Sequence, residues 1–218
     1  MKHRNDRGSE LRSIYDSIRV EVSRQLELFS RRWEFATDRE LFIQLVFCLL
    51  TPQSKARQCW RAVQILLEDD LLFHGRPADI AARIPIVRFR NKKAEYIVRA
   101  RETLYGLDRP SLRSILDQHA VAFDMRSWLA SAVTGYGYKE ASHFLRNIGH
   151  GGSLAILDRH ILKNLTAFGV IDGPPSNLSA ARYLTYENAM RDFSQSINIP
   201  LDYLDFVLWY KETGDIFQ

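Results

Sequence analysis

Two helical segments that meet at a glycine turn constrain the fold of this 218-residue chain most strongly. Apolar residues recur at helical spacing up to Val133 and again from Ala141. Gly135 and Gly137 lie between them, and glycine adopts positive φ at little cost, so a tight turn can join the two helices. Amides at the start of the second helix meet the positive end of its dipole, which suits a phosphate. The pattern fits a phosphate-binding hairpin or a corner that only packs.

Helical periods also occupy the rest of the chain. An apolar stripe predicts a helix from Leu11 to Trp33, and Thr37 opens the next helix through a capping box. The run 41–50 is apolar on nearly all sides, which predicts a central buried helix. Ser54 is the expected N-cap of the helix after it. Since no alternating segment longer than a few residues predicts a strand, the fold class should be all-α.

Composition excludes several classes of protein. Hydrophobic residues make up 46% of the chain, which is enough for a core and excludes a disordered chain. Cys48 and Cys59 lie at apolar positions and predict buried thiols; two cysteines are too few for a four-cysteine iron–sulfur cluster. The six histidines show no zinc-ligand spacing, so no metal and no cofactor are expected. A charged N-terminus and no bilayer-length apolar run predict a soluble, intracellular, reduced protein without membrane contact.

Lys139 and Asp158 are the candidate catalytic pair. Lys139 lies at the start of the hairpin's second helix, where the helix dipole disfavours the ammonium form and favours a nucleophilic amine. Asp158 follows 19 positions later and precedes another helix. Its carboxylate could stabilise a developing positive charge, cap that helix, or do both. A solvated charge is the plain alternative for a helical lysine.

The motifs around this pair resemble a known family. The hairpin with Lys139 and Asp158 is similar to the helix-hairpin-helix-GPD DNA glycosylases. Three further segments make the chain resemble the small 8-oxoguanine DNA glycosylase/lyases of archaea and some bacteria, from roughly Leu41 to the C-terminus. These segments are Leu49-Leu50-Thr51-Pro52-Gln53-Ser54, Arg88-Phe89-Arg90-Asn91-Lys92-Lys93-Ala94, and the tail from Leu201 to Tyr210.

The resemblance implies a fold, an activity and a partner. The fold would be one two-lobed helical domain, residues 1–218, without an iron–sulfur cluster, with the hairpin at about 124–149 and the terminal helices packed together as one lobe. The activity would be excision of 8-oxoguanine through a lysine Schiff base, followed by strand cleavage through β-elimination. The partner would be double-stranded DNA containing oxidised guanine, bound by a monomer without a cofactor in the nucleoid.

The resemblance and the charge pattern together indicate further contacts. Gln53 would lie at the DNA interface, beside the gap left by the extruded nucleotide. Arg88, Arg90 and Lys92 precede an expected helix at 94–105 and could hold a phosphate backbone, although a solvated charged loop has the same composition. The net charge of +4 and the pI of about 9.1 permit such a polyanionic partner.

The base pocket is expected partly on the C-terminal helix. Asp205 and Trp209 share one face of that helix, so a carboxylate and a large aromatic ring are available together. The aromatic ring would stack on the flipped purine and the carboxylate would accept from its edge. Relatives often end in a lysine, whereas this chain ends in Gln218, which leaves only a terminal carboxylate for the pocket.

Two alternatives remain open from the sequence. A non-catalytic helix-hairpin-helix module would bind DNA through Gly135 and Gly137 alone. The same chemistry could also act on oxidised pyrimidines. Lys139 together with Asp158 favours an enzyme, because simple binding requires neither an amine nor a carboxylate beside the hairpin.

Overall fold

The computed structural model describes residues 2–106, 109–175 and 177–217. Every regular element within these ranges is an α-helix, which confirms the all-α prediction. The helices are α1 (Lys2–Phe35), α2 (Asp38–Leu50), α3 (Ala56–Glu68), α4 (Leu71–His74), α5 (Pro77–Arg83), α6 (Arg90–Leu104), α7 (Leu112–Leu116), α8 (Ala122–Ala132), α9 (Tyr138–Asn147), α10 (Arg159–Ala167), α11 (Ala180–Ser196) and α12 (Leu201–Thr213).

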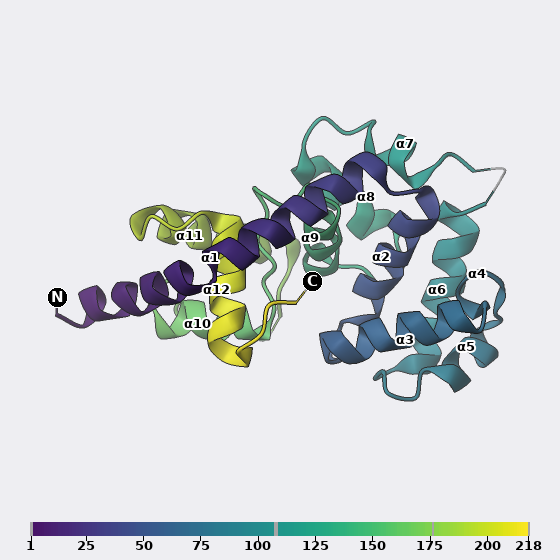
Figure 1. Cartoon of the computed structure of the whole chain (residues 1–218), viewed down its shortest axis with the longest axis horizontal. Helices are drawn as coiled ribbons and strands as arrows, with labels where there is room; N and C mark the ends of the chain where they lie inside the picture. The colour runs from purple at the N-terminus through teal and green to yellow at the C-terminus, as the bar shows by residue number, and fades with distance from the viewer. Residues whose placement is uncertain (1, 107–108, 176, 218) are drawn as a thin grey trace.

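The helices form two groups (Figure 1), and each group has its own hydrophobic core. One core belongs to residues 38–154, here called the middle lobe, and contains α2 to α9. The other core belongs to α1 and residues 155–217, here called the terminal lobe, in which α1 packs along α12. The chain thus starts in the terminal lobe, forms the whole middle lobe and returns to the terminal lobe. The segments that connect the two lobes lie where the lobes meet.

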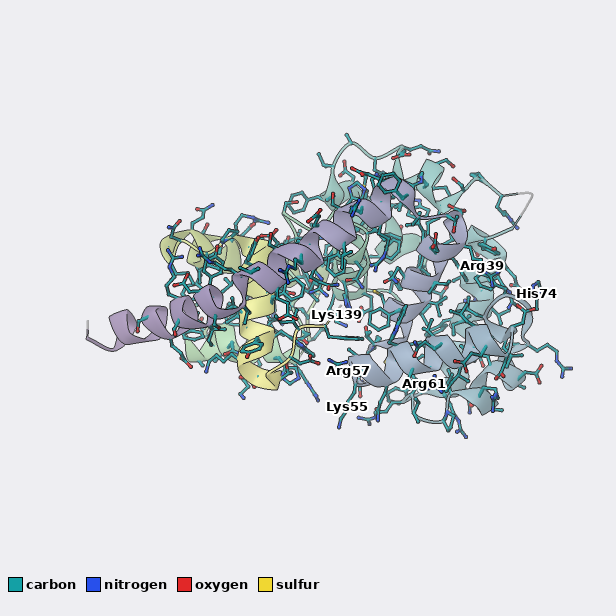
Figure 2. All side chains as sticks on the ribbon, viewed as in Figure 1. Arg39, Lys55, Arg57, Arg61, His74 and Lys139 are labelled. Carbon is teal, nitrogen blue, oxygen red and sulfur yellow. The ribbon has the colours of Figure 1, made fainter. Side chains whose placement is uncertain are left out.

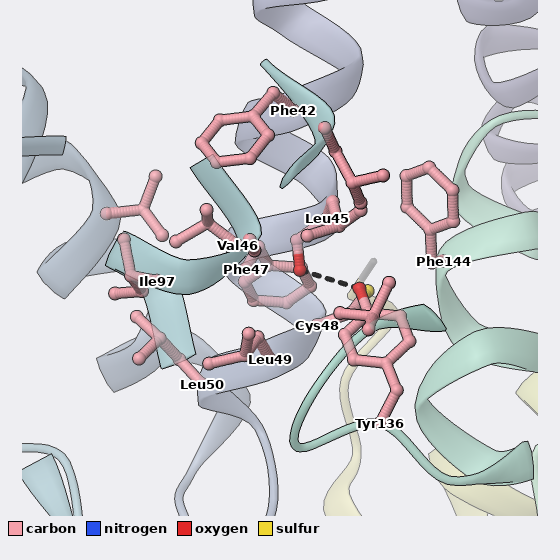
Figure 3. Close-up of a cluster of buried hydrophobic side chains, with 14 of the residues drawn as sticks. Phe42, Leu45, Val46, Phe47, Cys48, Leu49, Leu50, Ile97, Tyr136 and Phe144 are labelled. Atoms are coloured by element: carbon pink, nitrogen blue, oxygen red, sulfur yellow. Dashed lines mark hydrogen bonds between the residues drawn. The ribbon is translucent and has the colours of Figure 1, made fainter. Parts of the chain in front are cut away.

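Helix α2 is the centre of the middle lobe. Thr37 begins it with a capping box, in which its backbone amide donates to the Glu40 carboxylate at 2.7 Å, as the sequence predicts. The segment from Leu41 to Leu50 is buried almost throughout, and Figure 3 shows its side chains surrounded by those of α6, α9 and the hairpin turn. In the same view the Tyr136 hydroxyl donates to the Leu45 carbonyl at 2.6 Å, which ties the hairpin turn to α2.

Helices α8 and α9 form the predicted hairpin, but its two glycines differ. Gly135 has φ of 93°, and a Cβ atom there would lie 2.4 Å from the Tyr96 ring, so both backbone and space require glycine. Gly137 is extended at φ −115°, and its amide donates to the Glu140 carboxylate at 3.1 Å. The positive φ that the sequence allows at both glycines therefore occurs only at Gly135, and the third residue of α9 covers the Gly137 amide.

Three expected helix starts are also wrong. Helix α1 begins at Lys2 rather than Leu11. Lys55, not Ser54, occupies the N-cap of α3, because the Ser54 hydroxyl accepts hydrogen bonds from another segment. Helix α6 begins at Arg90 rather than at residue 94, since the left-handed conformation of Phe89 (φ 57°) turns the chain into the helix earlier.

Among the described residues, no helix is long and apolar enough to cross a membrane. No group of three or more histidine, cysteine or acidic side chains in the described part of the chain could hold a metal ion.

Candidate active site

A cleft of about 930 Å³ lies where the two lobes meet. The middle lobe lines it with the α2–α3 turn and one side of α9, and the terminal lobe lines it with residues 156–161 and α12. Figure 2 shows Lys139 near the centre of the molecule, across from Lys55 and Arg57 at the start of α3. Side chains distant in sequence therefore face one cleft.

Lys139 points its amine into a polar corner of this cleft. It is the second residue of α9, and its Nζ donates to the Thr51 hydroxyl at 3.0 Å. The Glu140 carboxylate lies 3.5 Å from Nζ. The side chain is 21% exposed, so the amine is held by neighbours yet remains reachable from the cleft.

Asp158 lines the cleft from the terminal lobe. It is the N-cap of α10, and one oxygen, Oδ1, accepts from the amides of His160 at 2.8 Å and Ile161 at 2.9 Å. The capping role that the sequence allowed is confirmed. Because both cap bonds use the same oxygen, the cap fixes the carboxylate while the side chain lines the cleft.

Asp205 forms a buried ion pair at the floor of the cleft. Nη1 of Arg146 donates to its Oδ2 at 2.5 Å, and both side chains line the cleft. Burial raises the pKa of Asp205 to about 6; Arg146 opposes the rise and the negative charge of Asp158 adds to it. The carboxyl group can therefore exist in either protonation state near neutral pH.

Trp209 lies one helical turn beyond Asp205 and also lines the cleft. Its indole is half-buried and meets the His160 ring edge to face, with centroids 5.2 Å apart. His160 lies in turn 3.8 Å from the Glu212 carboxylate. The tryptophan ring is thus fixed from one side while part of it remains accessible.

The residues after α12 run back toward the middle lobe (Figure 1), and Asp215 and Phe217 among them line the cleft. Asp215 accepts two hydrogen bonds from the Arg57 guanidinium, at 2.6 and 2.7 Å. The Phe217 ring lies under the same guanidinium at 4.8 Å and packs against Phe47 of α2. Gln218, expected in the base pocket, lies outside the described residues.

The predicted DNA contacts divide into two groups. Gln53, in the left-handed conformation with φ of 55°, and Arg88 are exposed and line the cleft. Arg90 and Lys92 are exposed on the first turn of α6, outside the cleft lining. Gly135 and Gly137 are exposed in the hairpin turn, also outside that lining.

Sequence reasoning missed the lysine that holds the α2–α3 turn. Lys93 is only 4% exposed, and its Nζ donates to the carbonyls of Leu50 and Pro52, both at 2.7 Å, and to the Ser54 hydroxyl at 3.2 Å. Burial lowers its pKa to about 8. A signal was present, because Lys93 shares the helical spacing of the buried residues Ile97, Ala100 and Leu104.

The two thiols near the site are inert. Burial raises the pKa of Cys48 strongly and that of Cys59 to about 11. Both side chains are free and buried, as the sequence predicts, and both remain protonated at neutral pH. Neither thiol therefore competes with an amine as a nucleophile.

Comparison with known proteins gives consistent matches over nearly the whole chain. A family model described as 8-oxoguanine DNA glycosylase matches residues 22–199. A protein of Fusobacterium nucleatum subsp. nucleatum named 8-oxoguanine DNA glycosylase/AP lyase is 39% identical over 215 residues, covering 99% of each chain. A protein of the same name from Methanocaldococcus jannaschii is 33% identical and covers 97% of this chain and 95% of its own.

Solved structures match the fold as well. The crystal structure of the 8-oxoguanine DNA glycosylase of Thermotoga maritima aligns with a TM-score of 0.88 and 31% identity, covering 99% of this chain and 100% of the other. The Methanocaldococcus jannaschii 8-oxoguanine glycosylase/lyase in complex with a 15mer DNA containing 8-oxoguanine aligns with a TM-score of 0.87 and 30% identity, covering 97% and 99%.

Titration of Asp205 should change the stability of the protein. Its folded-state pKa of about 6 lies above the ordinary 3.8, so the folded protein binds this proton more tightly than the unfolded chain. The stabilisation from the protonated form is complete below 3.8 and is lost as the pH rises through about 6. Across this interval the wild type should lose roughly 3 kcal/mol of unfolding free energy relative to Asp205→Asn.

Denaturant unfolding of the two proteins between about pH 3.5 and about pH 7 measures this difference. Titrating groups distant from Asp205 are common to both proteins and cancel in the comparison. If the difference in unfolding free energy between the two proteins stays constant with pH, the proton that the folded protein binds belongs to another group.

Proposed function

The chain belongs to the 8-oxoguanine DNA glycosylase family, and from this premise we propose how its own residues excise the base and cleave the strand. The function is that of a bifunctional DNA glycosylase and AP lyase acting on 8-oxoguanine. The observation that carries the mechanism is the Lys139 amine, which is held by Thr51 and faces the interlobe cleft together with Asp158.

Lys139 is the nucleophile. Its Nζ lone pair forms a bond to C1′ of the damaged nucleotide while the bond from C1′ to the base breaks, and the electron pair of that bond leaves with the base. The base takes up a proton and the new C1′ amine releases one, so the charges balance. Opening of the sugar ring, with proton transfer to its oxygen, converts the C1′ amine into an imine. Loss of a C2′ proton then expels the 3′ phosphate, and water hydrolyses the imine to free the lysine.

Asp158 stabilises the positive charge that develops on the sugar. Its Oδ1 is fixed by the two amides of the α10 cap, so the carboxylate does not need to reorganise when the charge appears. It can also move the proton that Lys139 must lose before attack. The cap and the chemical role therefore belong to one side chain.

Asp205, Trp209 and the C-terminal end of the chain, Gln218 included, form the base pocket. The half-buried indole offers a stacking surface, and the carboxylate one helical turn away can accept a hydrogen bond from the base edge. The returning tail, held by Arg57 through Asp215, covers the pocket beside these side chains. Such a pocket takes the damaged base only after it has left the duplex.

DNA lies across the mouth of the cleft. Gln53 contacts the gap left by the nucleotide, while Arg88, Arg90 and Lys92 contact phosphates. The hairpin turn at Gly135 and Gly137 contacts the backbone as well. One chain supplies all the residues that these steps use, so the proposed reaction, on the DNA of the nucleoid, needs neither a second subunit nor a cofactor.

The two alternatives fit less well. A non-catalytic hairpin module would not need a lysine and an aspartate that face the same cleft from different lobes. Oxidised pyrimidines would need the same sugar chemistry, but the relatives of this chain are named for 8-oxoguanine.

Lys139→Gln should abolish the covalent complex that borohydride traps with a duplex containing 8-oxoguanine, because glutamine has no amine lone pair for C1′. Binding to the same duplex should remain within about threefold of the wild type. The matched control is Lys55→Gln, which removes another lysine of the cleft lining and should leave trapping intact. Trapping of Lys139→Gln at the wild-type level would move the nucleophile to a different residue.

Asp158→Asn separates the cap from the chemistry. The asparagine oxygen can accept the same two amide bonds, so α10 and the melting temperature should stay unchanged while the negative charge is lost. The single-turnover rate of excision should fall about 100-fold or more, with little change in DNA affinity. An unchanged rate would leave Asp158 as a helix cap only.

Trp209→Ala tests the base pocket. Loss of one stacking surface should slow excision of 8-oxoguanine about tenfold to 100-fold. Cleavage at a preformed abasic site should change by less than about threefold, because that substrate has no base to stack. Equal losses in both reactions, or a large fall in melting temperature, would show that the ring only supports the fold.

A further inference from the structure

The hydroxyl group of Thr51 lies between α2 and the amine of Lys139. Thr51 is the C-cap residue of α2, is 7% exposed, and donates its single hydroxyl hydrogen to the Cys48 carbonyl at 2.8 Å. A hydroxyl group has only one hydrogen to donate, so toward Lys139 it can act only as an acceptor. The 3.0 Å contact therefore runs from Nζ to Oγ1 in either protonation state of the lysine.

The Glu140 carboxylate is a second acceptor beside the Lys139 amine. Its Oε2 accepts from the Gly137 amide at 3.1 Å, and its Oε1 lies 3.5 Å from Nζ of Lys139. A neutral amine has two hydrogens and one lone pair in tetrahedral directions. With one hydrogen on Thr51 and the other toward Glu140, the lone pair points away from both acceptors. The shorter contact, to Thr51, defines this orientation more tightly.

The position of Thr51 is fixed on both sides. The ammonium of Lys93 donates to the carbonyls of Leu50 and Pro52, the residues before and after it, both at 2.7 Å. Its contact with the Ser54 hydroxyl at 3.2 Å occupies the third N–H. Three bonds from one buried cation thus hold the short segment that presents the Thr51 hydroxyl to the cleft.

We infer that Thr51 is a positioning residue, whose hydroxyl orients the Lys139 amine so that its lone pair faces C1′ of the extruded nucleotide. This inference rests on Lys139 being the nucleophile. Thr51 forms and breaks no covalent bond in the reaction; it acts by accepting one N–H of the reacting amine. Without it the amine can rotate about its last side-chain bonds, and fewer of its orientations lead to attack.

The test compares Thr51→Val, Thr51→Ala and Thr51→Ser in single-turnover excision and borohydride trapping on a duplex containing 8-oxoguanine. Valine keeps the shape without the hydroxyl and should slow both steps about tenfold, the equivalent of one hydrogen bond. Alanine repeats the loss of the hydroxyl in case valine disturbs folding. Serine keeps the hydroxyl and should restore the rate to within about threefold of the wild type. DNA affinity should stay unchanged in all three.

Thr166→Val is the matched structural control. The Thr166 hydroxyl donates to the Leu162 carbonyl within α10 at 2.9 Å, so its loss removes the same kind of helix contact away from the amine. This control should keep the wild-type rate. The inference is overturned if a folded variant without the hydroxyl reacts at the wild-type rate, or if serine is as slow as valine. If borohydride still traps Lys139→Gln on the DNA, the assignment of the nucleophile is wrong. The order of excision rates among the Thr51 variants would then stand as a separate result.

Discussion

The geometry of the cleft depends on the hydrogen bonds that the buried ammonium of Lys93 donates to the turn between α2 and α3. Helix α2 ends at Leu50, and the last carbonyls of a helix need partners outside it. Lys93 bonds to the carbonyls of Leu50 and Pro52 and to Ser54, although removing a cation from water is unfavourable and lowers its pKa to about 8. The result is a rigid turn that positions Thr51 and Gln53 at the cleft, so these groups are in place before DNA arrives.

Buried ion pairs join the two lobes, and Phe217 of the terminal lobe also packs against the core of the middle lobe. Arg126 of α8 donates to both carboxylate oxygens of Glu187 in α11, at 2.6 and 3.0 Å, and both side chains are 1% exposed. Arg146 of α9 pairs with Asp205 of α12 through one hydrogen bond of 2.5 Å to Oδ2. Buried pairs contribute little net stability, but one partner left alone is costly, so they favour one relative placement of the lobes. That placement brings Lys139 and Asp158 to the same cleft.

The sequence predicts the fold well because helical periods and caps are local. The apolar run of α2, its capping box and the glycine hairpin depend on neighbours within a few residues, and the structure contains all three. One of the errors concerns a polar side chain with distant partners. The sequence predicts that Ser54 caps α3. In the structure its hydroxyl instead accepts hydrogen bonds from the Arg88 amide and the Lys93 ammonium, which are more than 30 positions away in the sequence. Local spacing does not show which polar groups bind each other over long distances in the sequence. For this reason the sequence does not predict the contact between Thr51 and Lys139.

The two lysines of this region show why geometry outweighs titration in assigning a nucleophile. A lowered pKa commonly marks a reactive amine, and by that criterion Lys93 would be chosen. However, its three hydrogen bonds need all three hydrogens of the ammonium, its side chain is 4% exposed, and it does not line the cleft. Lys139 is 21% exposed, bonds to one hydroxyl group and faces the cleft. Lys93 is therefore a structural cation, and its perturbed pKa reflects the burial needed to hold the turn beside Lys139, the proposed nucleophile.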